Sequence, residues 1–177
     1  MTRQNHLRLL TLTALLAAFV TVTTAFVKVP APLGYTHIGD SVVYLAAALL
    51  PGPYGFFAAS IGGALADLLA GYPQWALPTA IIKALNVLPF FLIRWTVKDA
   101  KRKEKIIHLP NLLMLLPTTL VTLGGYFVAN ALMYDAAAAT AELLPNLIQA
   151  TASGIVFVVL GIGLDAIRFK SKLIRMA

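Results

Sequence analysis

The stretch LLTLTALLAAFVTVTTAFV, which runs from Leu9 to Val27, contains no charged residue. A transmembrane helix needs about 20 consecutive and mainly apolar residues, so this stretch is long enough to cross a bilayer. It is too long for the apolar region of a signal peptide, and no clear small-x-small cleavage site precedes Lys28. We therefore expect it to be retained as the first membrane span.

Five more apolar stretches follow it along the chain. Of the 177 residues, 59% are hydrophobic and only 12% are charged, and the mean hydropathy of +0.82 is too high for a water-soluble fold. We predict an all-α, polytopic membrane protein in which residues 1–177 form one domain of six transmembrane helices. The expected helices are residues 7–27, 36–50, 54–71, 75–97, 110–133 and 145–167.

The positive charges predict how these helices are oriented. Of the 14 Lys and Arg residues, all but Lys28 and Lys83 lie near the N-terminus, between Arg94 and Lys105, or after Ile167. Lys and Arg near the ends of transmembrane helices are retained in the cytoplasm, so we expect both termini there. Because membrane topology explains the net charge of +7, we expect the lipid bilayer, and no nucleic acid, as the partner of these residues.

Each of the last three helices carries polar residues at a spacing of three or four. The sets are Trp75, Thr79, Lys83 and Asn86; Thr122, Tyr126 and Asn130; and Asn146, Gln149 and Ser153. Residues at this spacing share one face of a helix, and buried polar groups in a bilayer mark function or a helix contact. We predict that the three faces form a cavity that opens to the outside and is closed below.

The second and third predicted helices add two acidic residues at about the same depth in the membrane as these polar faces. Asp40 precedes Gly52, in the turn between these helices, by 12 residues, and Asp67 follows it by 15, so their heights differ by only about 5 Å. Both should lie near Lys83, and an unpaired charge in hydrocarbon costs several kcal/mol. We expect a structural ion pair between Lys83 and one of these acids, Asp67 in particular. The alternative is that Lys83 or an acid contacts a ligand.

The aromatic residues of this region allow two interpretations. Trp75 and Tyr126 share the polar faces and could stack on a flat ligand, whereas aromatic residues at a membrane boundary often belong to an interfacial belt. Tyr72 fits the belt better. His37 stands close to Asp40, but one His without a second ligand at helical spacing does not make a metal site. With no cysteine in the chain, we expect neither a metal nor a disulfide.

The first helix carries small residues at positions that allow another helix to approach closely. Ala14 and Ala18 stand four residues apart, the small-xxx-small spacing of close helix contacts in membranes. Packing within the bundle is the alternative use of this stripe. The chain has no P-loop, no GxSxG elbow and no HExxH motif, so we expect neither ATP hydrolysis nor another enzymatic activity from it.

Four segments together resemble a known family. They are PLGYTHIGD (residues 32–40), LAAALLPGP (45–53), GGALADLLAGY (62–72) and PTAIIK (78–83). They are similar to the S components of energy-coupling factor (ECF) transporters, the small vitamin-binding membrane subunits of these importers. Ala14-x-x-x-Ala18 matches the short motif with which that family docks on its coupling subunit. The resemblance covers residues 9 to 95, and the last two helices fit only by size and topology.

The resemblance implies a multi-pass subunit in the bacterial cell membrane that captures a vitamin-like solute from outside. It implies a partnership with a transmembrane coupling subunit, the T component, and two ATPase subunits that use ATP to topple the S component and release the solute inside. No cofactor is expected on this chain. By position, the substrate-binding residues would be Tyr35, His37, Asp40, Trp75, Thr79, Lys83, Asn86, Tyr126, Asn130, Asn146 and Gln149.

The kinds of side chain in the expected cavity favour a small planar heterocycle with several hydrogen-bonding groups. A pyridoxine-like or hydroxymethylpyrimidine-like compound fits this description, and a queuosine precursor or pantothenate are alternatives. A strongly anionic ligand such as folate should need more cations than Lys83 alone. Two other functions compete: a membrane scaffold or assembly factor whose polar residues only join helices, and a lipid-modifying enzyme, for which Asp165 is the only candidate on the cytoplasmic side.

Overall fold

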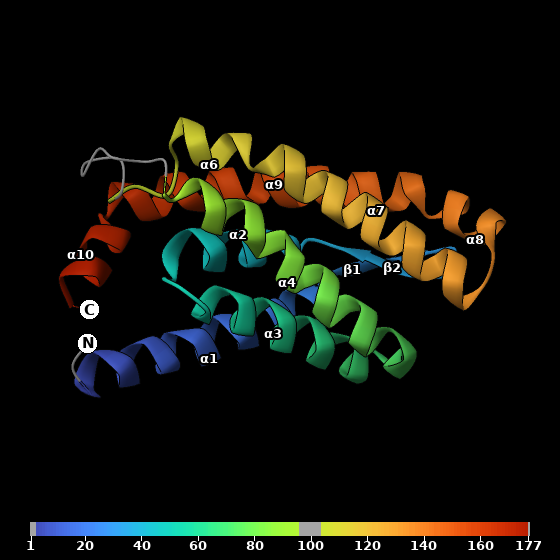
Figure 1. Ribbon diagram of the computed structural model, residues 1–177, viewed down its shortest axis with the longest axis horizontal. Helices are drawn as coiled ribbons and strands as arrows, with labels where there is room; N and C mark the ends of the chain where they lie inside the picture. Colours follow the sequence, from blue (N-terminus) through green and yellow to red (C-terminus); the bar gives the residue numbers. More distant parts are fainter. Residues whose placement is uncertain (1–2, 96–103, 177) are drawn as a thin grey trace.

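The computed structural model describes residues 3–95 and 104–176, which form helices and one short β-hairpin (Figure 1). The helices are α1 (Arg3–Phe26), α2 (Asp40–Leu49), α3 (Tyr54–Ala70), the 3-10 turn η1 (Pro73–Trp75), α4 (Ala76–Ile93), α6 (Leu109–Leu113), α7 (Leu115–Met133), α8 (Ala136–Ala141), α9 (Leu143–Ala166) and α10 (Phe169–Met176). The strands are β1 (Lys28–Ala31) and β2 (Gly34–His37).

The predicted all-α class is confirmed, whereas the six membrane spans stay a prediction. In the described residues, four helical segments are long and apolar enough to cross a membrane: Arg3–Phe26, Pro73–Ile93, Leu109–Met133 and Ala136–Ala166. The other two apolar helices, α2 and α3, have 10 and 17 residues. Helix α2 is shorter than expected because Thr36 and His37, at its expected start, pair with β1 instead.

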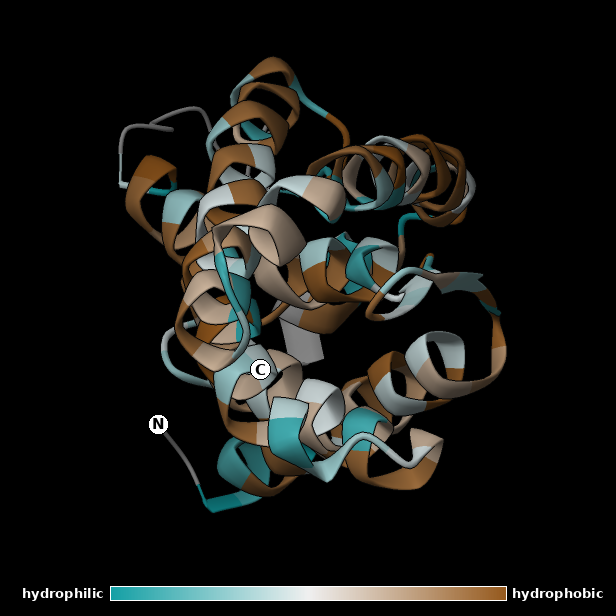
Figure 2. Cartoon of the chain, turned by 90° about the vertical axis from the view of Figure 1, so that its right-hand side faces the viewer, coloured by the Kyte–Doolittle hydropathy of each residue, from teal (hydrophilic) through white to brown (hydrophobic). Residues whose placement is uncertain are grey.

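The two termini lie at the same end of the molecule, and the hairpin and α8 lie at the opposite end (Figure 1). We call these the termini end and the hairpin end. Seen from the hairpin end, the helices surround a centre, and apolar residues predominate along them (Figure 2). Helix α2 occupies that centre: all ten of its residues are buried, and it contacts α1, α3, α4 and α9.

An aromatic cluster closes the centre of the bundle toward the termini end. Tyr44 stacks on Phe90 with ring centroids 6.0 Å apart, and Phe157 meets both rings edge-on at 6.0 and 5.9 Å. All three side chains are almost completely buried. On its own helix, each of these rings lies closer to the termini end than the buried polar residues do. The rings therefore separate the polar side chains near the hairpin end from the termini end.

Two glycines of α3 allow neighbouring helices to come unusually close. A Cβ atom on Gly62 would lie 2.7 Å from the carbonyl oxygen of Ala17 on α1, and the Thr21 hydroxyl donates to the Gly62 carbonyl at 3.0 Å. On the other side, a Cβ on Gly63 would lie 2.9 Å from the Lys83 side chain on α4. Small residues thus bring α1, α3 and α4 together without a hydrophobic drive from water.

Arg94 fixes the end of α2 at the termini end. Its guanidinium donates to the carbonyls of Leu50 at 2.9 Å and Ala47 at 3.0 Å. The last four carbonyls of a helix have no partner within the helix, and a cation near that end also interacts favourably with the helix dipole. Arg94 therefore supplies partners for carbonyls at the end of the buried helix α2.

The fifth apolar stretch is interrupted in its first half. Helix α6 ends at Leu113, and α7 begins at Leu115. Pro117 has no N–H group to donate to the carbonyl four residues earlier, which is that of Leu113, so the break lies where the hydrogen bond would be missing.

At the termini end, Asp165 has a structural role. Its two oxygens accept the backbone N–H groups of Ile106 at 2.7 Å and Ile107 at 2.8 Å. Nearby, the ammonium group of Lys170 donates to the Lys105 carbonyl at 3.0 Å. These bonds hold the segment that precedes α6 against α9. They give a structural reason for Asp165, which the sequence analysis considered as a candidate residue of a lipid-modifying enzyme.

Candidate functional site

A pocket opens at the hairpin end, between the hairpin, α3, α4, α7 and α9. The empty space inside it is about 450 Å³ when the open solvent at its mouth is included. We call it the polar pocket. The residues that line it are Leu33, Gly34, Tyr35, His37, Asp67, Tyr72, Trp75, Thr79, Tyr126, Asn130, Glu142, Asn146 and Gln149.

The hairpin covers one side of the polar pocket and is tied down at two points. The Tyr35 hydroxyl donates to Asp67 on α3 at 2.7 Å, and the Leu33 N–H donates to Glu142, between α8 and α9, at 2.7 Å. Burial and the charge of Asp67 raise the pKa of Tyr35 far above its usual value, so its hydroxyl remains a donor at physiological pH. Two carboxylates on opposite sides therefore hold the hairpin in place.

The end of α3 delivers aromatic residues to the polar pocket. Gly71 adopts a left-handed conformation (φ 86°), and the Tyr72 N–H returns to the Asp67 carbonyl at 2.8 Å, as in the common glycine-terminated helix ending. The chain then turns through η1 into α4. This turn brings Tyr72 and Trp75 to the pocket wall.

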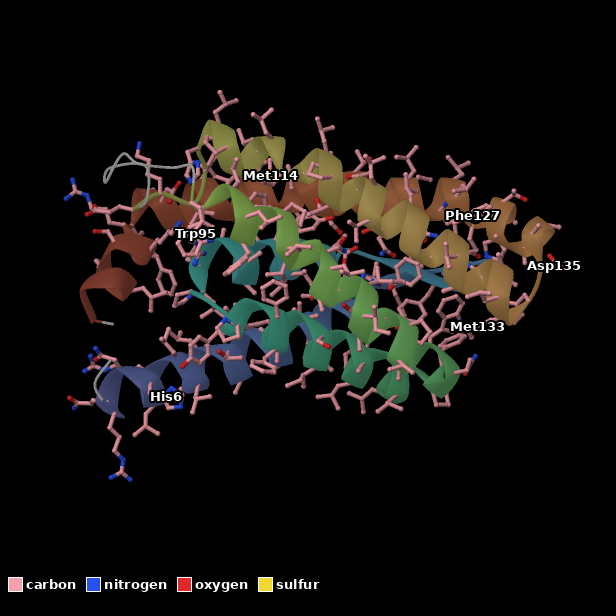
Figure 3. The ribbon with its side chains drawn as sticks, viewed as in Figure 1. His6, Trp95, Met114, Phe127, Met133 and Asp135 are labelled. Carbon is pink, nitrogen blue, oxygen red and sulfur yellow. The ribbon has the colours of Figure 1, made fainter. Side chains whose placement is uncertain are left out.

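Aromatic rings form much of that wall. The Trp75 indole lies 5.9 Å from the Tyr126 ring and 6.3 Å from the Tyr134 ring, while Tyr35 and Tyr72 pack together at 5.4 Å. Met133 and Asp135, which flank Tyr134, are labelled at the hairpin end in Figure 3, opposite His6 and Trp95. Trp75 is only 7% exposed, so it belongs to the pocket rather than to an interfacial belt.

Three buried polar atoms of the lining residues have no hydrogen-bond partner in the part of the chain that the structure describes. They are the Trp75 indole Nε1, Asn130 Oδ1 and Asp67 Oδ2. Asn130 donates from Nδ2 to the Tyr126 carbonyl at 2.9 Å, and Asp67 accepts from Tyr35 only through Oδ1. Unpaired buried polar atoms are rare in folded proteins because each costs about 1–3 kcal/mol. The wall thus offers one unused donor and two unused acceptors.

His37 contributes a neutral ring. Its Nδ1 accepts the Gly39 N–H at 3.0 Å, so the other nitrogen, Nε2, carries the proton and can donate to a ligand. Burial, followed by the nearby charge of Lys83, lowers the pKa of His37 to about 3. The ring is therefore uncharged at neutral pH and suits a neutral ligand.

A buried ion pair lies behind the wall. The Lys83 ammonium is 2.5 Å from Asp40 Oδ1, and both side chains are fully buried. The predicted partner, Asp67, bonds to Tyr35 instead, which corrects the expected Asp67–Lys83 pair. Asp40 starts the central helix α2 and meets Lys83 of α4 inside the bundle. The second Asp40 oxygen, Oδ2, accepts from Gln149 Nε2 at 3.0 Å.

Most of the predicted site residues converge on the polar pocket. Those that line it are Tyr35, His37, Trp75, Thr79, Tyr126, Asn130, Asn146 and Gln149. Asp40, Lys83 and Asn86 do not line it; they are fully buried, and Asn86 donates to Thr122 at 3.0 Å. These three lie behind the wall because their helices face one another there.

Glu142 and Tyr72 also line the polar pocket, although the sequence reasoning missed Glu142 and favoured the belt for Tyr72. A pattern that could have identified Glu142 was present. Glu142, Asn146, Gln149 and Ser153 follow one another at spacings of four, three and four, so they share one face of α9 and its entry turn. Ser153 is fully buried one turn below Gln149 and is not part of the wall.

On the first helix, Ala14 and Ala18 are both exposed on the surface of the bundle, while Ala17 between them is buried against α3. The structure therefore does not show Ala14 and Ala18 packing within the bundle, which was the alternative role for this stripe. Within the described residues, no group of three or more His, Cys, Asp or Glu side chains could hold a metal ion.

Long apolar helices around a pocket of aromatic and amide side chains define a multi-pass membrane protein with a site for a small solute. The family model of the ECF-type riboflavin transporter S component matches residues 4–166, and the chain belongs to this family. It is a substrate-binding membrane subunit of an ECF transporter, and membership implies a T component and ATPases as partners. It is also similar to a Pyrococcus woesei protein described as "Uncharacterized protein in gap 3'region", with 36% identity over 142 residues, 77% of this chain and 87% of that protein.

Proposed function

We propose that the polar pocket captures riboflavin, or a closely related flavin, from outside the cell. The observation that carries this proposal is the wall of Tyr72, Trp75 and Tyr126 combined with the unpaired Trp75 N–H and Asn130 carbonyl among the described residues. A flat ring system packs on aromatic faces, and a flavin carries both acceptors and N–H or O–H donors at its edge. The description of the matching family names the same vitamin.

The charges around the polar pocket support a neutral substrate. Lys83 is paired with Asp40 and lies outside the wall, His37 is uncharged, and the carboxylates of Asp67 and Glu142 face the pocket from two sides. An anionic ligand such as folate would meet negative charge, and none of the described lining residues is a Lys or Arg that could balance it. A flavin without a phosphate group avoids this cost.

A single-ring vitamin is the second candidate. A pyridoxine-like or hydroxymethylpyrimidine-like compound could also pack against Trp75 and bond to Asn130, and it would leave part of the pocket to water. Queuosine precursors and pantothenate are further alternatives, although pantothenate brings a carboxylate toward Asp67 and Glu142. Binding measurements with these compounds side by side distinguish them.

We further propose that residues 1–177 form one substrate-binding domain with six membrane-crossing segments and both termini in the cytoplasm. Helix α2 would then cross inside the bundle, whereas α3 would face lipid with its exposed apolar residues, such as Phe57, Ile61 and Leu65. The exposed stripe of Ala14 and Ala18 would dock on the T component, and the ATPase subunits would hydrolyse the ATP that topples this subunit, which itself catalyses no reaction. The cell membrane of a bacterium is the proposed location.

The two tryptophans of the chain provide a direct binding test. Trp75 lines the polar pocket, whereas Trp95 is 77% exposed at the termini end (Figure 3). In purified Trp95→Phe protein, riboflavin should quench the remaining Trp75 emission with a Kd below about 1 μM, which corresponds to about 8 kcal/mol. In Trp75→Phe protein, the emission of Trp95 should change little.

The same titration with pyridoxine, hydroxymethylpyrimidine and pantothenate identifies the substrate class. If one of these compounds binds more tightly than riboflavin, that compound takes the place of the flavin as the proposed substrate. If no compound binds, the scaffold alternative gains support. That alternative also predicts that Lys83→Ala and Asn130→Ala destabilise the protein without changing uptake in cells.

A further inference from the structure

Gln149 is the pocket residue whose hydrogen-bonding polarity is decided by a residue behind the wall. Its amide has a donating nitrogen and an accepting oxygen of nearly equal size, so either could face the pocket. The bond from Nε2 to Asp40 Oδ2 at 3.0 Å decides between them. Because a carboxylate can only accept, Gln149 must turn its nitrogen toward Asp40 and leave its carbonyl Oε1 for the pocket.

Asp40 holds this position because of Lys83. The ammonium group has only donors, and it occupies the other Asp40 oxygen, Oδ1. Each step from Lys83 through Asp40 to Gln149 is therefore dictated by which groups donate and which accept. All three side chains are buried almost completely, so water does not offer alternative partners to the chain of bonds.

We propose that Asp40 is a positioning residue that makes the α9 wall of the polar pocket an acceptor, so that the site selects solutes presenting an N–H or O–H group to Gln149. The selection of a particular solute rests on the proposed function, whereas the orientation of the amide does not. Asn130 shows the same arrangement on α7, where its nitrogen is held by a backbone carbonyl. Two walls thus accept, and the Trp75 indole donates.

The substitution Asp40→Asn should reverse the polarity of Gln149. Lys83 forces the carbonyl of the new amide toward itself, so the nitrogen of that amide must point at Gln149. Gln149 then turns its own carbonyl toward the substituted side chain and its NH2 group to the pocket. The volume of the side chain at position 40 hardly changes, so the reversal is separable from a change in packing.

Side-chain amide exchange of the purified protein, without ligand, tests the orientation directly. The chain has three glutamines: Gln4 and Gln74 are exposed and serve as internal references, and the Gln149 signals are those that vanish in Gln149→Glu. In the unsubstituted protein, the Gln149 N–H bound to Asp40 should exchange at least about 100-fold more slowly than the references. In Asp40→Asn it should exchange at least about tenfold faster than before. Unchanged exchange in folded Asp40→Asn protein would overturn the proposal.

A second variant keeps the proposal testable if Asp40→Asn does not fold because the Lys83 charge is left unbalanced. The double substitution Asp40→Asn/Gln149→Glu restores the charge. The new amide at position 40 accepts from Lys83 and donates to the new carboxylate at position 149, whose other oxygen faces the pocket as an acceptor. We expect riboflavin affinity within about threefold of that of the unsubstituted protein.

A loss of more than about tenfold in the folded double variant would contradict the role of polarity. The failure of the proposed function has a different signature, since the unsubstituted protein would then not bind riboflavin at all. In that case amide exchange alone decides this inference.

Discussion

The Tyr35 hydroxyl donates to Asp67 Oδ1 at 2.7 Å and so joins the hairpin to α3 at the wall of the polar pocket. A hydrogen bond to a charged group contributes about 1.5–3 kcal/mol. Its loss in Tyr35→Phe should let the hairpin open more often, and the riboflavin dissociation rate should rise about tenfold or more in stopped-flow fluorescence. Tyr54→Phe, which removes a hydroxyl bonded to His6 at the termini end, is the matched control. Equal dissociation rates in both variants would show that the bond does not retain the ligand.

Arg94 should be important for stability but not for ligand affinity. Arg94→Met leaves the carbonyls of Leu50 and Ala47 without their donor, and buried unpaired acceptors cost about 1–3 kcal/mol each. We expect thermal unfolding in detergent at a clearly lower temperature, while riboflavin still binds to the folded fraction with unchanged Kd. Lys172→Met, at an exposed position on α10, should unfold like the unsubstituted protein. If Arg94→Met does the same, its bonds to α2 contribute little.

Gly62 and Gly124 form a matched pair for testing the contact between α1 and α3. A methyl group on Gly62 would lie 2.7 Å from the Ala17 carbonyl oxygen and from Val20, whereas one on Gly124 would meet nothing within 4 Å. Gly62→Ala should push the helices apart and lower the melting temperature. Gly124→Ala should be neutral or stabilising by up to about 1 kcal/mol, because Ala favours the helix. Similar melting temperatures for both variants would mean that the close contact is not needed.

The exposed stripe on α1 should matter only for coupled uptake. Ala14→Trp or Ala18→Trp adds bulk to the surface proposed to meet the T component, far from the polar pocket. We expect loss of vitamin uptake in cells that contain the whole transporter, with riboflavin affinity of the purified subunit retained. Leu120→Trp, at a position 69% exposed on α7, is the control for bulk on the lipid-facing surface. Normal uptake by the α1 variants would remove the docking proposal.

His37 should make the stability of the protein depend on pH. Its folded-state pKa is lowered to about 3 from about 6.5 in an unfolded chain, so the unfolded state binds more protons between these values. Stability is therefore complete above a pH of about 6.5 and falls by up to about 1.4 kcal/mol per pH unit as the pH drops toward about 3. His37→Asn keeps an acceptor for the Gly39 N–H and removes the titration. The melting temperature should fall less between a pH of about 7.5 and about 5 in this variant, and equal falls would contradict the assignment.

The sequence predicted the parts of the site that depend on helical spacing. Trp75 and Thr79, Tyr126 and Asn130 stand four residues apart and share faces because the helix geometry is local. The relation between these faces was harder to predict, since heights along helices say little about lateral position. Asp67 and Lys83 were expected to pair because their predicted heights along the helices were similar. In the structure, α2 lies at the centre of the bundle, so Lys83 pairs with Asp40 instead.

The hairpin also lay beyond what spacing could predict. Pro30 and Pro32 indicate a break in the helix, and the antiparallel pairing of residues 28–31 with residues 34–37 depends on support from both sides of the pocket. That support comes from Asp67 and Glu142, which are distant in the sequence. The spacing of residues along one helix carries no information about contacts between such distant segments.

Helix α2 has ten residues, all of them shielded from the surroundings by other parts of the protein. Bilayers differ in thickness, and spans that touch lipid respond by tilting or by deforming the membrane around them. A segment without lipid contact does not need to tilt or to deform the membrane in this way. Since α2 starts with Asp40, the carboxylate that orients Gln149 stands on a segment on which a change in membrane thickness does not act directly.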